Sequence, residues 1–197
     1  MPHLHIGDIV PKFSTLDNQG TVWTQDSFKS NWTLIHFQTQ IGDDMLKQIQ
    51  YMDRLFRATK GELQVVGVVV SNGHNQKTFM KEHGFSFPVL LDEHLQLVRA
   101  FGTWEPFKGY HKSYMNVIPS LFLLDQKGYV IWQQTHICAY ELPRLMEAIL
   151  RDFYISYDRD ALKEPQELLV SDEETEEDLY TLFEDEIEAT EEIQSHV

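Results

Sequence analysis

The chain has 197 residues, and its 31 acidic and 16 basic side chains give a formal net charge of −15 at pH 7. This length suits one ordinary domain with an appendage, and 42% hydrophobic residues are enough to build a buried core. The charge argues against nucleic acid and anionic membranes as partners, because both are bound by clustered Lys and Arg. A single cysteine, Cys138, excludes an internal disulfide, a CxxC redox couple and a four-cysteine zinc site.

The negative charge is concentrated in the C-terminal part of the chain. Residues 164–197 hold 14 of the 31 acidic residues and no Lys or Arg, which leaves 17 acidic and 16 basic residues in 1–163. We therefore predict a domain over 1–153 and an acidic tail over 154–197 that is largely disordered or conditionally helical. The first residues lack the basic and apolar segments of a signal peptide, and no apolar run reaches the roughly 18–20 residues that span a bilayer. The expected location is the cytoplasm.

The body of the chain alternates between strand-like and helix-like segments. The short apolar run 33–37 predicts a buried strand, and apolar residues at three-to-four spacing over 43–58 predict an amphipathic helix. The valine-rich segment 63–70 predicts a central strand buried on both faces. The remaining predicted elements are helices over 77–83, 93–101 and 141–153, and strands over 120–124 and 129–134 that are joined by a turn at Gly128. This order predicts an α/β fold with a mixed central sheet flanked by helices.

Several short motifs occur in the order that is typical of one known family. The first is Gly7-Asp8-x-x-Pro11-x-Phe13-x-x-x-Asp17-x-x-Gly20, which resembles the first hairpin of the peroxiredoxins of the AhpC/TSA class. The second is Phe79-x-x-x-His83-Gly84-x-x-Phe87-Pro88-x-Leu90-x-Asp92, which resembles their bacterioferritin-comigratory (Q-type) subgroup. The resemblance extends from about residue 7 to residue 153. It implies a thioredoxin-like fold, followed here by the acidic C-terminal tail.

The resemblance also implies a peroxide-attacking cysteine at the start of the first long helix, where the thiolate is the nucleophile. The corresponding turn reads Gln38-Thr39-Gln40-Ile41-Gly42-Asp43-Asp44-Met45 and contains no cysteine. When the turn is aligned with the disulfide-reductase pattern, Gly42 and Met45 fall at the two cysteine positions. Neither Asp nor Gly replaces a thiolate in attack on an O–O bond. We therefore expect neither thiol peroxidase activity nor disulfide exchange at this turn, whose degenerate positions are Gln40, Gly42, Asp43, Asp44 and Met45.

Three polar positions near the turn have alternative interpretations. Asp43 and Asp44 suit the start of a helix, where a carboxylate caps free amides and complements the dipole. A metal site formed by these two residues and His36 is the alternative, but His36 lies within an apolar strand and is better explained as a hydrogen-bonded core histidine. We predict no metal and no cofactor.

The thiol of Cys138 is either a buried, inert group or a site of mixed-disulfide formation with an external thiol.

A second candidate site lies before the strand predicted over 120–124. Ile118-Pro119-Ser120 resembles the cis-proline segment of thioredoxins, whose preceding backbone pairs with extended substrates. The alternative is an ordinary proline at the entry of a strand. The Q-type peroxiredoxins usually have an arginine about here, so the resemblance implies the loss of a second catalytic element. We take Ile118, Pro119 and Trp104 as candidate binding residues.

The acidic tail contains apolar residues at helical spacing, among them Leu179, Phe183 and Ile187. Such a segment could fold on docking to a protein partner, whereas the alternative is a tail that only solubilises the domain. Two functions therefore remain. The first is a redoxin-fold protein that has lost thiol catalysis and acts by binding another protein. The second is a peroxiredoxin-like antioxidant oxidoreductase that uses Cys138 with an external thiol.

Overall fold

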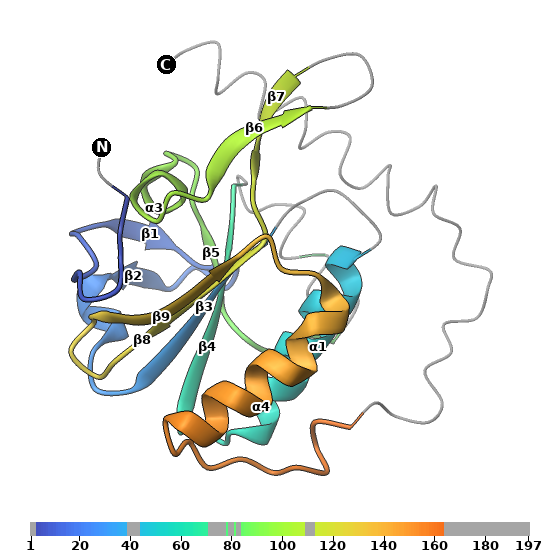
Figure 1. The fold of residues 1–197 in the computed structure, drawn as a ribbon. Coiled ribbons are helices and arrows are strands. Elements are labelled where there is room, and N and C mark those ends of the chain that lie inside the picture. Colours follow the sequence, from blue (N-terminus) through green and yellow to red (C-terminus); the bar gives the residue numbers. More distant parts are fainter. Residues whose placement is uncertain are drawn as a thin grey trace.

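The computed structural model describes residues 3–38, 44–70, 78, 81, 84–108 and 113–163. At its centre is a five-stranded sheet with the strand order β5–β4–β3–β8–β9 (Figure 1). β3, β4 and β5 are parallel, whereas β8 is antiparallel to β3 and β9 is antiparallel to β8. Two separate hairpins are formed by β1 with β2 and by β6 with β7. The strands are β1 (Ser14–Leu16), β2 (Val22–Thr24), β3 (Trp32–Phe37), β4 (Leu63–Val69), β5 (Val89–Leu91), β6 (Trp104–Lys108), β7 (Ser113–Val117), β8 (Ser120–Leu124) and β9 (Val130–Thr135).

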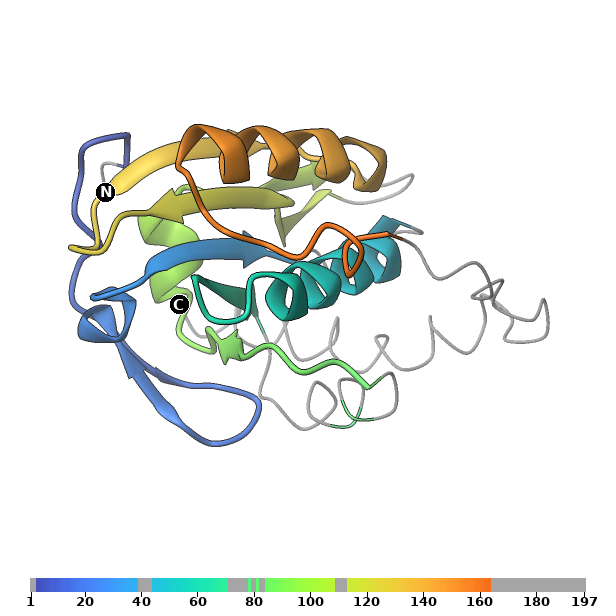
Figure 2. The same ribbon diagram turned by 90° about the horizontal axis from the view of Figure 1, so that it is seen from below.

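Helices lie on both faces of the sheet (Figures 1 and 2). α1 (Asp44–Ala58) and α4 (Leu142–Asp152) share one buried apolar cluster with the sheet. α3 (Gln96–Ala100) and the 3₁₀ turn Gln25–Phe28 belong to a second cluster on the opposite face. The expected mixed sheet flanked by helices is therefore confirmed. Among the described residues no helix has the length and apolar character needed to cross a bilayer.

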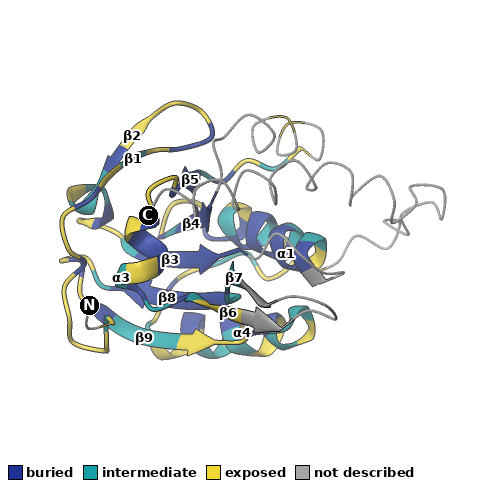
Figure 3. Ribbon diagram, turned by 90° about the horizontal axis from the view of Figure 1, so that it is seen from above, coloured by how far each residue is buried: buried dark blue, intermediate teal, exposed yellow. Residues whose placement is uncertain are grey.

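The apolar patterns of the sequence account for these layers. In α1 the side chains of Met45, Ile49, Met52 and Leu55 recur every three or four residues, and all are buried. The central strands have side chains that are buried on both faces, as a sheet between two helical layers requires. Figure 3 shows that β3 and β8 are buried along almost their whole length, whereas β9 at the edge is half-buried and ends exposed.

Two expectations differ from the structure. The helix predicted over 93–101 is shorter, because Leu95 takes a left-handed conformation with φ 55° and α3 begins only at Gln96. The β6–β7 hairpin was not predicted, although it contains Trp104, one of the candidate binding residues. The helix predicted over 77–83 falls largely outside the described residues. Within this range the structure describes only Thr78 and Lys81, and both are helical.

Residues 154–163 continue from α4 along the body of the molecule. The backbone N–H of Ile155 donates to Leu150, and its side chain is buried in the same cluster as α1 and α4. The N–H of Asp158 donates to the carbonyl of Ala58 over 2.8 Å, which places this segment at the C-terminal end of α1. The division at residue 153 stays a prediction, and the described residues beyond it contact the body. Residues 164–197, with Leu179, Phe183 and Ile187, lie outside the described residues.

Candidate functional site

The connection from β3 to α1 is the place where the sequence predicts an emptied active site. The N–H of Gln38 donates to the carbonyl of Val68 over 3.0 Å and so extends the parallel pairing of β3 with β4 by one residue. The degenerate positions Gln40, Gly42 and Asp43 lie outside the described residues, and Asp44 is the first residue of α1. Met45 is 8% exposed and belongs to the core cluster under α1, so its side chain contributes packing.

His36 is a core histidine, as the sequence predicts. Its ring is 1% exposed, and Nε2 lies 3.0 Å from Oε1 of Gln48 on α1. Because this amide oxygen only accepts, Nε2 carries the ring proton. Burial lowers the pKa of His36 to about 4, and the hydrogen bond that the ring donates to Gln48 raises it in part. A neutral imidazole that is fully enclosed and held by an amide stabilises the fold.

A second buried amide lies beside this histidine. The side chain of Gln38 is 2% exposed, and neither its amide nitrogen nor its oxygen has a hydrogen-bond partner among the described residues. A methyl group placed on Gly67 of β4 would come within 2.6 Å of Nε2 of Gln38. The missing side chain at Gly67 therefore makes room for this amide at the C-terminal ends of β3 and β4.

Trp104, Ile118 and Pro119 are brought together by the β6–β7 hairpin. Trp104 is the register partner of Val117, and the N–H of Ile118 donates to the carbonyl of Thr103 over 2.7 Å. All three candidate binding residues are half-buried, so part of each side chain reaches solvent. The structure thus brings the backbones of these residues close together.

The backbone around Pro119 does not offer the docking strand that the thioredoxin resemblance implies. Every peptide bond among the described residues is trans, including the one before Pro119, which directly precedes β8. The N–H of Ile118 is used by Thr103, and its carbonyl accepts from the hydroxyl of Ser120 over 2.8 Å. This arrangement fits the interpretation of Pro119 as an ordinary proline at the entry of a strand. A protein partner that binds here would have to contact side chains.

Cys138 follows a residue that is hydrogen-bonded to Pro119, and the 3₁₀ turn after it contacts α1. The N–H of Ile137 donates to the carbonyl of Pro119 over 3.1 Å, and the carbonyl of Ile137 lies 3.5 Å from the amide nitrogen of Gln48. Cys138 is half-buried, and its N–H donates to the carboxylate of Glu141 over 3.0 Å within the 3₁₀ turn Ala139–Glu141. Cys138 therefore directly precedes the 3₁₀ turn that leads into α4, and this turn contacts α1 (Figure 1).

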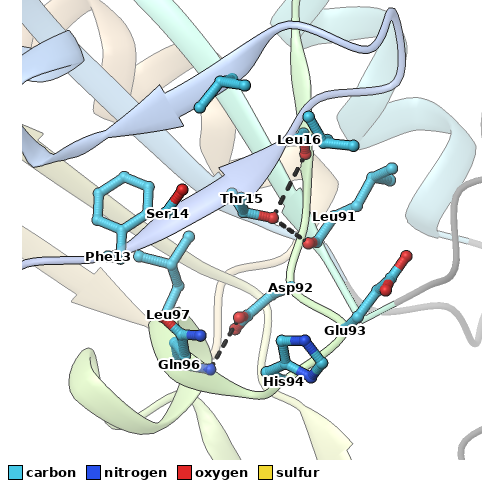
Figure 4. Close-up of a pocket in the computed structure, with 11 residues that line it drawn as sticks. Phe13, Ser14, Thr15, Leu16, Leu91, Asp92, Glu93, His94, Gln96 and Leu97 are labelled. Atoms are coloured by element: carbon cyan, nitrogen blue, oxygen red, sulfur yellow. Dashed lines mark hydrogen bonds between the residues drawn. The ribbon is translucent and has the colours of Figure 1, made fainter.

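The structure also contains a groove that the sequence did not predict. Its volume is about 230 Å³, and Figure 4 shows its walls, formed by β1 and by residues 91–97. The carboxylate of Asp92 is directed into the backbone at the start of α3, where it accepts from the N–H groups of Gln96 and Val98 at 2.8 Å each. Burial raises the pKa of Asp92, and these N–H donors lower it in part. Asp92 is thus a helix cap, and none of the predicted site residues lines this groove.

Metal binding has no support in the described part of the chain. No group of three or more His, Cys, Asp and Glu side chains within it is arranged to hold an ion. His36 uses one ring nitrogen for Gln48, and its surroundings are apolar.

Comparison with known proteins identifies the family. The profile described as the AhpC/TSA family matches residues 6–133, about two thirds of the chain. The chain belongs to the AhpC/TSA family. A putative peroxiredoxin of Mycobacterium tuberculosis is 26% identical over 135 residues, which cover 68% of this chain and 86% of that protein. Peroxiredoxin Bcp of Bacillus subtilis is 22% identical over 141 residues, which cover 68% of this chain and 88% of that protein.

Solved structures of family members have the same fold. A cysteine-to-serine mutant of PrxQ from Xylella fastidiosa superposes with a TM-score of 0.70 at 16% identity, over 78% of this chain and 99% of that chain. Peroxidoxin BcpB from Mycobacterium tuberculosis superposes with a TM-score of 0.65 at 20% identity, over 76% of this chain and 98% of that chain. The predicted thioredoxin-like fold and the resemblance to Bcp and PrxQ peroxiredoxins are confirmed.

Within this family fold, sequence reasoning missed the partners of the site residues. Gln48 was counted only as part of a helix, although it joins His36 to the segment before Cys138. Its polar side chain on the buried face of an amphipathic helix is the signal that could have identified it. The pairing of Trp104 with Val117 had no comparable signal, because β6 contains Pro106 and two charged residues.

Proposed function

We propose that this protein is a member of the AhpC/TSA family that has lost thiol peroxidase and disulfide-exchange activity and acts by binding another protein. The observation that carries the proposal is the position of the only cysteine. Reduction of a peroxide by a thiol begins with attack of a thiolate on the O–O bond, which yields a sulfenic acid and releases an alcohol or water. No residue from Gln38 to Met45 has a sulfur nucleophile at the start of α1, since the thioether of Met45 is buried in the core.

The competing function is peroxide reduction by Cys138. In that cycle the peroxide would oxidise the Cys138 thiolate to sulfenic acid, and two equivalents of an external thiol would reduce it again, with release of water and of the disulfide of the external thiol. Cys138 is only half-buried, which favours this alternative. Against it, Cys138 precedes the 3₁₀ turn Ala139–Glu141 and does not lie at the start of α1.

The binding surface that we propose is formed by Trp104, Ile118 and Pro119. Each of the three residues is half-buried, and the main chain of Ile118 is already hydrogen-bonded. Recognition would therefore depend on apolar side-chain contacts with a protein partner. The acidic tail adds a second, charged contact to this proposal. The cytoplasmic location and the exclusion of nucleic acid and membrane partners remain predictions.

The binding surface is tested by an apolar-to-acidic substitution with a matched control. We would immobilise the full-length wild type, Ile118→Asp and Ile131→Asp, and compare the proteins that each retains from a cell lysate. Ile131 is a half-buried isoleucine at the other end of β9, so its variant reproduces the chemical change away from the surface. We expect Ile118→Asp to lose a partner that the wild type and Ile131→Asp both retain. Retention of the same proteins by all three, or of none by the wild type, would contradict the proposal.

A further inference from the structure

The groove between β1 and residues 91–97 has an apolar floor and an apolar lip. The floor consists of Phe13, Leu91 and Leu97, which line the groove and are at most 9% exposed. The lip consists of Leu16 and Val22, which are register partners in the β1–β2 hairpin and are 47% and 61% exposed. Exposed apolar side chains beside a concave site with an apolar floor are typical of a surface that binds a ligand.

Four polar side chains also line this groove. Ser14 belongs to the β1 wall, and Glu93, His94 and Gln96 belong to the opposite wall (Figure 4). Among the described residues, none of these four side chains has a hydrogen-bond or ion-pair partner. Polar groups that converge on an apolar floor and are not used within the fold are available to a ligand.

The charges that line the groove favour a cation. Among the described residues that line it, the ionisable ones are Asp92, Glu93 and His94, and none is Lys or Arg. The carboxylate of Asp92 accepts from the backbone at the start of α3, so it is already used. Lys12 and Arg99, the nearest cations along the chain, do not line the groove. The carboxylate of Glu93 is therefore the charged group with which a ligand can pair.

The size of the groove limits the size of this ligand. Its volume of about 230 Å³ is below the roughly 300–1,000 Å³ of most ligand sites. A water molecule in the liquid takes up about 30 Å³, so the groove has room for roughly eight of them. A ligand that fills it therefore has about eight to ten non-hydrogen atoms.

We propose that this groove binds a small organic cation that combines an ammonium group with an apolar body. The apolar body lies on the floor beneath the lip, and the ammonium group pairs with Glu93. An ammonium group has three donors, and the hydroxyl of Ser14 and the amide oxygen of Gln96 are further acceptors. None of the candidate binding residues Trp104, Ile118 and Pro119 lines this groove, so the inference does not rest on the proposed function.

The test is a titration of the isotope-labelled, full-length protein, followed through its amide NMR signals. Phenethylammonium is the probe, and phenethyl alcohol and phenylacetate are neutral and anionic probes of similar size. We expect phenethylammonium to shift the signals of residues 13–16 and 91–97 with half-saturation at about a millimolar concentration. Phenethyl alcohol should need about a two- to fivefold higher concentration, because it lacks the ion pair. Phenylacetate should give no saturable shift.

Matched variants separate the groove from the general charge of the chain. A net charge of −15 attracts any cation, so Glu93→Gln is compared with Glu62→Gln, which removes an exposed carboxylate outside the groove. We expect Glu93→Gln to raise the half-saturation concentration of phenethylammonium to that of the alcohol, and Glu62→Gln to leave it unchanged. Leu16→Ser removes part of the lip and should weaken both probes. Ile6→Ser changes a 62% exposed isoleucine outside the groove and should weaken neither.

Three results would overturn the proposal. The first is the absence of saturable shifts at the groove with phenethylammonium in a protein whose amide spectrum is native. The second is binding of the alcohol or of phenylacetate as tight as that of the cation, because the groove would then not select charge. The third is an equal effect of Glu93→Gln and Glu62→Gln. None of these results depends on which proteins Ile118→Asp retains, so failure here and failure of the proposed function are distinguishable.

Discussion

The ring of His36 and the side-chain amide of Gln48 form a hydrogen bond of 3.0 Å inside the core, between β3 and α1. The same amide directs its nitrogen toward the carbonyl of Ile137, 3.5 Å away, just before Cys138. One glutamine thus links the strand, the helix and the segment leading into α4. This polar link joins the two elements on either side of the β3–α1 connection, and it positions core elements.

The first prediction is that stability falls as the pH drops from about 6.5 to about 4. The pKa of His36 is about 4 in the folded protein, against its ordinary value of 6.5, so the unfolded chain binds the proton more readily across this window. The stabilisation is complete above 6.5 and is lost as the pH falls through 4. A shift of this size corresponds to roughly 3 kcal/mol. Urea denaturation at a series of pH values measures it.

The control for this prediction is His36→Gln, which retains a hydrogen-bonding amide but does not titrate. Burial raises the pKa of Asp92, and this acts in the opposite direction as the pH falls. Only the difference between wild type and His36→Gln therefore isolates the histidine. Identical pH profiles of the two proteins would show that His36 is not the group that titrates.

The second prediction concerns the amide that holds His36. Gln48→Ala removes the partner of His36 Nε2 and leaves a buried donor unsatisfied, which should lower the free energy of unfolding by about 1–3 kcal/mol. Gln50→Ala is the matched control, because Gln50 is on the same helix but half-buried on its outer side. We expect the control to change stability by less than about 0.5 kcal/mol. Equal losses in thermal unfolding would contradict the structural role of Gln48.

The third prediction concerns the space at Gly67. Gly67→Ala would place a methyl group 2.6 Å from Nε2 of Gln38 and 3.1 Å from Val89, so we expect a loss of about 1–3 kcal/mol. Adding Gln38→Ala removes the atom that clashes and should restore part of this loss. A double-mutant cycle from chemical denaturation measures the coupling. Additive effects would show that the two residues do not compete for space.

The fourth prediction concerns the cap of α3. Asp92→Ala removes the acceptor of the N–H groups of Gln96 and Val98 and should cost about 1–2 kcal/mol. Asp92→Asn retains one acceptor oxygen and should cost less. Hydrogen exchange of the α3 amides measures the effect locally. Protection that is unchanged in both variants would contradict the capping role.

Much of the fold could be predicted from the sequence, because its periodicity is strong. The bounds of β3, α1, β4, β8, β9 and α4 all lie within one or two residues of the predicted ranges. The ladder β6–β7 has no such pattern, since Pro106 and neighbouring charges interrupt any alternation. Its existence depends on the pairing of β6 with β7, which the residue types do not predict. The shortening of α3 likewise depends on the left-handed conformation of a leucine, which residue type does not predict.

For the candidate site, the sequence predicts the roles of several residues but not which partners they contact. The absence of cysteine from the β3–α1 turn is visible in the sequence, and the core role of His36 follows from the apolar strand around it. The identity of its partner depends on how α1 is rotated above the sheet. The N–H of Ile118 cannot pair with a docked strand, because it donates to the carbonyl of Thr103, 15 residues earlier. The two residues are close because the β6–β7 hairpin lies between them in the chain.

The most direct test of the central claim is peroxide consumption by the purified full-length protein. Hydrogen peroxide and an organic hydroperoxide would be supplied separately, with dithiothreitol or a thioredoxin as the electron donor, and wild type would be compared with Cys138→Ser. We predict that both proteins consume peroxide at the rate of buffer alone. Turnover by wild type that Cys138→Ser abolishes would contradict the account and establish Cys138 as the nucleophile of an active peroxidase.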